Sequence, residues 1–96
     1  MRFLVIYYPL WSSKFLQIFR LAGVGKTSGE RYWVPWIHRC NGEWIRDHHY
    51  AGALRESDAL SVTRGVRPAK CLGQMGPDEL VSRYPEVTML LMEPVG

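Results

Sequence analysis

Histidine and cysteine residues gather in one segment near the middle of the chain, residues 38–49. Zinc is bound by these side chains, commonly in pairs two to four residues apart, and a cysteine beside a histidine can also act as a nucleophile with its base. The candidate groups are His38, Cys40, His48, His49 and, from a later segment, Cys71. Because the chain has no Cys-x-x-Cys pair and no glycine-rich nucleophile turn, we interpret them as a half-buried cysteine among surface histidines and expect no bound metal, no cofactor and no enzymatic activity. A small enzyme or zinc protein that uses His38, Cys40 and His49 is the alternative.

The residues Gly25-Lys26-Thr27 match the end of the phosphate-binding motif G-x-x-x-x-G-K-[ST]. Counting back from them, the first glycine of the motif belongs at position 20, which is Arg20. The motif also opens a helix, whereas this stretch follows a predicted one. We therefore expect Lys26 to lie in a basic loop that can contact an anion without hydrolysing a nucleotide.

A mixture of aromatic and basic side chains follows this loop. Its members are Arg31, Tyr32, Trp33, Trp36, Arg39, Trp44 and Arg46. Such residues can form a core in which arginine stems cover tryptophan rings, a protein interface, or a surface on which single-stranded nucleic acid stacks. We rank these interpretations in that order, and the aromatic motif of RNA-recognition domains is absent from the sequence.

A second basic segment, residues 63–70, carries Arg64, Arg67 and Lys70 around Gly65 and Pro68. A basic loop with fixed bends suits contact with an anion. The same composition is typical of a solvated surface loop, and we favour that second interpretation.

The first half of the chain predicts a strand, a helix and a hairpin. Residues 2–8 form a β-branched and aromatic run that predicts a buried strand. A helix capped by Ser12 or Ser13 is expected to follow and to end at Gly23. Its apolar face would carry residues at spacings of three and four, namely Phe15, Ile18, Phe19 and Ala22.

Asn41-Gly42 is the strongest short signal for a two-residue hairpin turn. This turn would set Cys40 opposite Glu43 and Arg39 opposite Trp44. Because strand side chains alternate, one face of the hairpin would carry Trp33, Ile37, Arg39, Trp44, Arg46 and His48. Pro35 lacks an amide donor and is expected to lie at a sheet edge.

The second half predicts a short helical turn at 51–57, a strand at 59–66, a loop at 67–76, a helix at 77–84 and a central strand at 87–92. The whole chain, residues 1–96, is then one α+β domain. It would have a mainly antiparallel sheet with two helices on one face, in the ferredoxin-like order β-α-β-β-α-β.

Charge and composition complete the expectation of function. The net charge of +3 divides unevenly, with eleven Lys and Arg against five acids in residues 1–70 and one against four in residues 71–96. Such a layout suits an anionic partner. Because the excess of +3 is modest, we favour ordinary surface charge as its interpretation. Two cysteines without a disulfide framework, and an N-terminal apolar run too short to span a bilayer, favour a soluble cytoplasmic protein.

The sequence therefore favours a small non-enzymatic protein that binds a protein or a ribonucleoprotein. The expected contact residues are Lys26, Trp33, Arg39, Trp44, Arg46, Arg64 and Arg67. Small proteins without motifs are common among phage and mobile-element accessory proteins that inhibit host machinery, including anti-CRISPR proteins, and such a regulatory role is our expectation from frequency alone. Direct binding of RNA or single-stranded DNA is the first alternative.

Overall fold

The computed structural model describes residues 1–9, 14–47, 52–61, 63–64 and 67–92, and all structural statements concern these residues. They form a small α+β domain. The strands are β1 (Phe3–Pro9), β2 (Lys14–Val24), β3 (Arg31–Cys40), β4 (Glu43–Arg46), β5 (Leu54–Arg55), β6 (Thr63–Arg64), β7 (Arg67–Pro68) and β8 (Lys70–Met75). The helices are α1 (Glu56–Ser61), α2 (Pro77–Arg83) and α3 (Thr88–Met92), and a 3-10 turn, η1 (Pro85–Val87), joins the last two.

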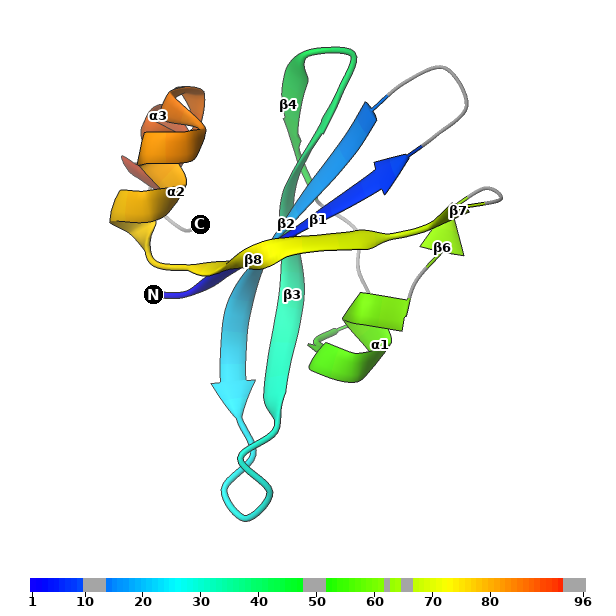
Figure 1. Ribbon diagram of the computed structural model, residues 1–96. Helices are drawn as coiled ribbons and strands as arrows, with labels where there is room; N and C mark the ends of the chain where they lie inside the picture. The colour runs from blue at the N-terminus through cyan, green and yellow to red at the C-terminus, as the bar shows by residue number, and fades with distance from the viewer. Residues whose placement is uncertain (10–13, 48–51, 62, 65–66, 93–96) are drawn as a thin grey trace.

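The main sheet has six strands, and every pairing in it is antiparallel. Its order is β4-β3-β2-β1-β8, with β5 added to the outer side of β3, while β6 and β7 pair separately. The sheet is strongly twisted, so that β8 crosses β3 at a steep angle (Figure 1).

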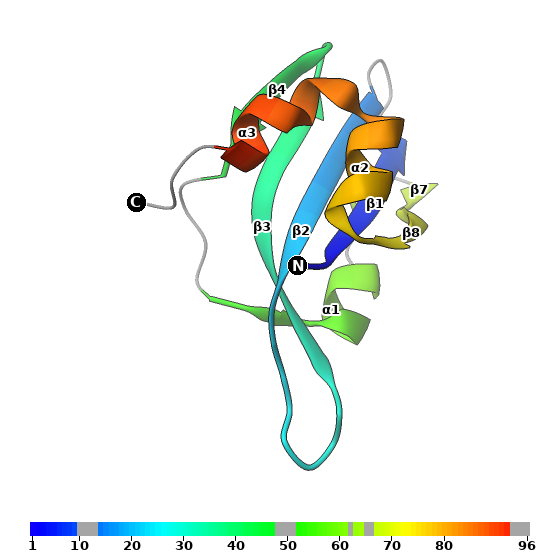
Figure 2. The ribbon, with the colours of Figure 1, turned by 90° about the vertical axis from the view of Figure 1, so that its left-hand side faces the viewer.

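Strand β1 is the centre of the structure, and its side chains are buried on both faces. Phe3 and Val5 belong to one apolar cluster, which includes residues of α2 and η1, and against which α3 packs. Leu4 and Ile6 belong to a second cluster on the other face, together with Ala59 of α1. Figure 2 shows α2 and α3 in front of the sheet. The buried strand expected at residues 2–8 is confirmed, but the helices cover both faces and not one.

The helix expected between Ser12 or Ser13 and Gly23 is wrong where the structure describes it, because residues 14–24 form strand β2; the two serines lie outside the described residues. The side chains of β2 alternate, with Ile18 in the first cluster and Phe19 in the second. A run in which most residues are apolar fits a two-faced buried strand as well as a helix. The ferredoxin-like order, which needs a helix at this place, is not confirmed.

The hairpin expected at Asn41-Gly42 is confirmed. Cys40 pairs with Glu43 and Arg39 with Trp44, and both turn residues have positive φ, 57° for Asn41 and 80° for Gly42, as this turn requires. Pro35 lies between the stretches of β3 that β4 and β5 pair with, so the local edge expected there is also present.

A bulge at Trp36 corrects the expected faces of the hairpin. Ile18 pairs with Ile37, whereas the next residue, Phe19, pairs with Pro35, so Trp36 is an extra residue in β3. The bulge interrupts the alternation of side chains. Ile37 therefore belongs to the first cluster and Trp33 to the second, although both were expected on one face.

The second half of the chain departs most from expectation. Residues 70–75, expected as a loop, form β8, which pairs with β1. Residues 88–92, expected within a central strand, form α3, and α1 extends to Ser61 within the segment expected as a strand. The helix expected at 77–84 is confirmed as α2, with Pro77 in its first turn. In the part of the chain that the structure describes, no helix has the length and apolar character needed to cross a membrane.

Two substitutions in β2 test whether residues 14–24 form this strand or the helix expected from the sequence. Leu16 is 5% exposed, whereas Ala22, which the helix would place on its buried face, is exposed. We expect Leu16→Ala to lower the free energy of unfolding by about 2–5 kcal/mol, because it leaves a cavity. Ala22→Ser should change it by less than about 0.5 kcal/mol. Urea denaturation measures both, and a larger loss for Ala22→Ser would contradict the strand.

Candidate functional site

The side chains of Arg39, Trp44, Tyr84 and Glu86, which we name the Arg39 cluster, join the β3–β4 hairpin to the C-terminal helical segment. The guanidinium of Arg39 lies 5.0 Å from the ring centroid of Trp44 and 5.8 Å from that of Tyr84. Glu86 accepts hydrogen bonds of 3.0 Å from Arg39 Nη1 and 3.0 Å from Trp44 Nε1. The rings of Trp44 and Tyr84 meet edge to face, with centroids 5.8 Å apart.

Local structure puts these four residues in place. Arg39 and Trp44 are a cross-strand pair, which brings their side chains together on one face. Tyr84 ends α2, where its backbone N–H donates to Leu80, and Pro85 begins the turn that carries Glu86. The cluster therefore depends on the hairpin turn and on the end of α2.

The cluster combines fixed geometry with access to solvent. The side chains of Arg39 and Glu86 are 32% and 46% exposed. The hydrogen bond from Trp44, the backbone hydrogen bond at Glu86 and then the charge of Arg39 hold the pKa of Glu86 below its ordinary value of 4.5, although partial desolvation acts in the opposite direction. Glu86 is thus a carboxylate at neutral pH, and it fixes both of its partners.

A polar network lies on the opposite face of the hairpin. Nδ1 of His38 is 2.9 Å from Oδ1 of Asp47, and Gln17 Nε2 donates to Asp47 Oδ2 at 2.8 Å and to the Ile37 carbonyl at 2.9 Å. The His38 ring stacks on Phe15, with centroids 5.0 Å apart. Gln17 is only 4% exposed, while His38 and Asp47 are about a fifth exposed. Asp47 can hold the imidazole in one orientation, as a residue that orients a general base does.

Trp33 belongs to a third arrangement. It is fully buried, and its Nε1 donates to Glu56 Oε1 of α1 at 3.0 Å. Gln74 of β8 donates to the same oxygen at 2.7 Å and accepts from Arg31. For Trp33 the core interpretation is therefore the correct one, and its side chain is not part of a surface.

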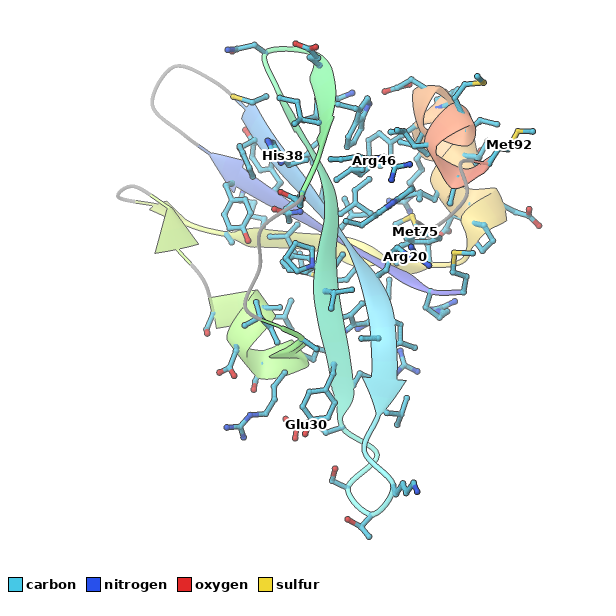
Figure 3. The ribbon with its side chains drawn as sticks, turned by 180° about the vertical axis from the view of Figure 1, so that it is seen from behind. Arg20, Glu30, His38, Arg46, Met75 and Met92 are labelled. Carbon is cyan, nitrogen blue, oxygen red and sulfur yellow. The ribbon has the colours of Figure 1, made fainter. Side chains whose placement is uncertain are left out.

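The structure thus separates the residues that the sequence suggested as one contact surface. Arg39, Trp44 and Arg46 share the side of β3 and β4 that faces α3, and Figure 3 shows Arg46 there and His38 on the other side. Lys26 is exposed in the loop between β2 and β3. Arg64 and Arg67 pair through their backbones in the separate β6–β7 hairpin.

In the described part of the chain, the candidate metal and nucleophile residues lie on two strands: His38 and Cys40 are on β3 and Cys71 is on β8, with β2 and β1 between these strands. Cys40 is half-buried beside the turn, Cys71 is exposed on β8, and both thiols are free. His48 and His49 lie outside the described residues. Among the residues that the structure describes, no three His, Cys, Asp or Glu side chains are grouped so that they could hold a metal ion.

The sequence did not reveal the residues that contact Arg39 and the His38–Asp47 pair. Tyr84 and Glu86 are more than 40 residues from Arg39, and Gln17 was placed in a helix that does not form. The only available signal was the sequence Tyr84-Pro85-Glu86, whose proline predicts a helix end but no contact with Arg39.

Comparison of the chain with protein-family models, with curated protein sequences and with solved structures finds no match.

Replacement of Glu86 tests the cluster through its pH dependence. Because the pKa of Glu86 is lowered on folding, its ionised form stabilises the fold above pH 4.5, and this contribution is lost as the pH falls through the lowered pKa. At pH 7 we expect Glu86→Gln to cost about 1 kcal/mol or less, since the pair is partly exposed. The difference from the parent protein should shrink at pH values below 4.5. If the difference in unfolding free energy between Glu86→Gln and the parent protein does not change with pH, the ionised Glu86 carboxylate does not stabilise the cluster.

Replacement of Asp47 tests the His38 network. Asp47→Ala removes an acceptor from the nearly buried Gln17 amide and from His38, and we expect a loss of about 1–3 kcal/mol in the free energy of unfolding. Glu43→Ala, at an exposed position of the same hairpin, is the control and should change it by less than about 0.5 kcal/mol. Equal stability of the two variants would show that the network does not hold the hairpin.

Proposed function

We propose that the protein is a non-enzymatic binding module that contacts a protein partner through the Arg39 cluster. The observation that carries this proposal is the partly exposed Arg39 guanidinium, which lies against the rings of both Trp44 and Tyr84 and is held there by the Glu86 carboxylate. Arginine, tryptophan and tyrosine are the residues that most often dominate the energy of protein interfaces. Because Glu86 already fixes the side chains, little side-chain entropy remains to be lost on binding.

The helix that follows the cluster adds apolar surface. In α3, Leu90 and Leu91 pack against the first cluster, whereas Met89 and Met92 are 73% and 77% exposed. Figure 3 shows Met92 directed away from the sheet. Flexible methionine side chains adapt to a partner's shape and are common on binding surfaces. These residues support a protein partner for this side of the molecule.

The charge of the cluster favours a protein over a nucleic acid. Glu86 places a partly exposed carboxylate beside Arg39 and Trp44, and a carboxylate repels phosphate. Trp33 is buried, and Trp36 packs against Phe3 with ring centroids 5.2 Å apart. Trp33 therefore has no open face of the kind on which bases stack, and Trp36 is only partly exposed.

We also propose a cellular compartment and a biological role for this binding module. The free thiols of Cys40 and Cys71 suit a reducing compartment, and we place the protein in the cytoplasm. A protein subunit of a ribonucleoprotein is one such partner. Inhibition of such an assembly, as in the anti-CRISPR-like role expected from frequency alone, is the biological role that we propose for the protein.

A second candidate function is acid–base chemistry at His38. The contact with Asp47 favours it, because a carboxylate on Nδ1 leaves Nε2 to exchange a proton. The small enzyme expected as an alternative would combine His38 with Cys40, two residues further along β3. His49, its third member, lies outside the described residues.

Affinity capture followed by identification of bound protein, with and without nuclease, tests the proposed function. Arg39→Ala should weaken binding of the captured protein by at least about 2 kcal/mol, roughly thirtyfold. Arg55→Ala removes the same charge from an exposed ion pair beside α1 and should bind like the parent protein. Circular dichroism establishes that both variants are folded. If folded Arg39→Ala binds as the parent does, or if nuclease abolishes capture, the proposed surface is wrong.

A further inference from the structure

Strands β2 and β3 continue beyond the rest of the sheet as a two-stranded ribbon, residues 22–31. β1 pairs with β2 only as far as Arg20, and one further hydrogen bond joins Leu21 N to the Arg2 carbonyl. β5 pairs with β3 only at Tyr32 and Trp33. Figures 1 and 2 show the ribbon projecting from the body, at the end opposite β4 and therefore away from the Arg39 cluster.

Cationic side chains without a carboxylate partner gather on the ribbon and at its base. In the described part of the chain, four such residues lie here, namely Arg2, Arg20, Lys26 and Arg31. Arg31 donates to the neutral amide of Gln74. By contrast, Arg39, Arg55 and Arg83 each face a carboxylate.

Two acidic residues lie near these cations and do not cancel them. Glu30 is half-buried within the ribbon, and Figure 3 shows it near the end of the strands. The Glu56 carboxylate accepts hydrogen bonds from Trp33 and Gln74. The ribbon and its base therefore carry an excess of positive charge.

The ribbon is narrow, and its end is held in one shape. Its sequence, AGVGKTSGER, contains no aromatic residue and is rich in glycine and other small residues. Gly25 N donates to the Glu30 carbonyl at 2.7 Å and Gly29 N donates to the Gly25 carbonyl at 2.9 Å. Gly29 has a φ of 71°, which the turn needs and which side chains disfavour.

We propose that this ribbon binds duplex DNA by entering the major groove. That groove is about 12 Å wide and admits a two-stranded antiparallel ribbon, whose strands lie about 4.8 Å apart. Lys26 lies at the end of the ribbon and Arg31 where the ribbon joins the body, while Arg2 and Arg20 lie at its base, where β1 and β2 still pair. A ribbon that enters the groove end first would carry Lys26 between the strands of the duplex and bring the cations at its base toward the flanking phosphates. Single-stranded nucleic acid is disfavoured because the ribbon has no aromatic side chain for stacking. The major groove of duplex RNA is too narrow and deep for side chains to read.

Fluorescence anisotropy with a labelled DNA duplex of about 20 base pairs, at about 50 mM salt, tests the proposal. Lys26→Glu should weaken binding at least about tenfold. Lys70→Glu makes the same charge change at another exposed lysine, on β8, and is the matched control that should bind within about twofold of the parent. Lys26→Ala should reduce the slope of log affinity against log salt by about 1.

Three results would overturn the proposal. They are no binding to the duplex at this salt concentration, an equal loss for Lys26→Glu and Lys70→Glu, and equal competition by single-stranded DNA or by duplex RNA. Because Lys26 is exposed at the end of the ribbon, these variants are expected to fold, and circular dichroism checks this. Binding of duplex DNA can fail while the Arg39 cluster still binds a protein, so the two proposals are tested separately.

Discussion

Burial of β1 on both faces is the constraint from which the rest of the fold follows. Phe3, Leu4, Val5 and Ile6 are all fully buried, and in a strand consecutive side chains point to opposite faces. One layer of helix cannot cover both, so the chain supplies α1 on one face and the segment from α2 to α3 on the other. These helices have between five and seven residues, too few to be stable alone. Each covering segment therefore depends on contacts with the sheet.

The two covering segments are fastened to the sheet in the same way. On one face, Glu86 accepts the indole N–H of Trp44 at 3.0 Å, and on the other, Glu56 accepts that of Trp33 at 3.0 Å. In both cases a carboxylate from the helical segment meets a tryptophan from the β3–β4 hairpin. Burial distinguishes the two. Trp33 is closed off in the core, whereas Glu86 and its partner Arg39 remain partly exposed. Similar chemistry thus gives a purely structural contact on one face and an accessible surface on the other.

Local signals in the sequence predicted local structure, and they failed where distant pairing decides. The turn at Asn41-Gly42 and the helix that begins at Pro77 were predictable, because their residues act on their own backbone. Residues 70–75 carry no strong strand signal and form β8 only because the edge of β1 needs a partner. The spacing of Val87, Leu90 and Leu91, all of which pack toward the first cluster, is helical in the structure. From sequence alone, a short apolar run such as residues 87–92 fits a buried strand as well as a helix.

The candidate site was predictable to the extent that it follows from the hairpin. Pairing of Arg39 with Trp44 followed from the turn, but the bulge at Trp36, which moves Trp33 to the opposite face, was not predicted. The neighbouring Pro35 suits either a sheet edge or a bulge, and the sequence suggested only the edge. The ribbon was expected only as a basic loop at Lys26, because residues 14–24 suggested a helix.

The stability of the folded domain does not explain the length of the ribbon. Most of its residues are exposed, and ordering each one costs about 1–2 kcal/mol of backbone entropy. Little apolar burial offsets that cost, since its one large apolar side chain, Val24, is 53% exposed. Contact with a partner outside the chain is the explanation that we propose for an extension that contributes so little to the core.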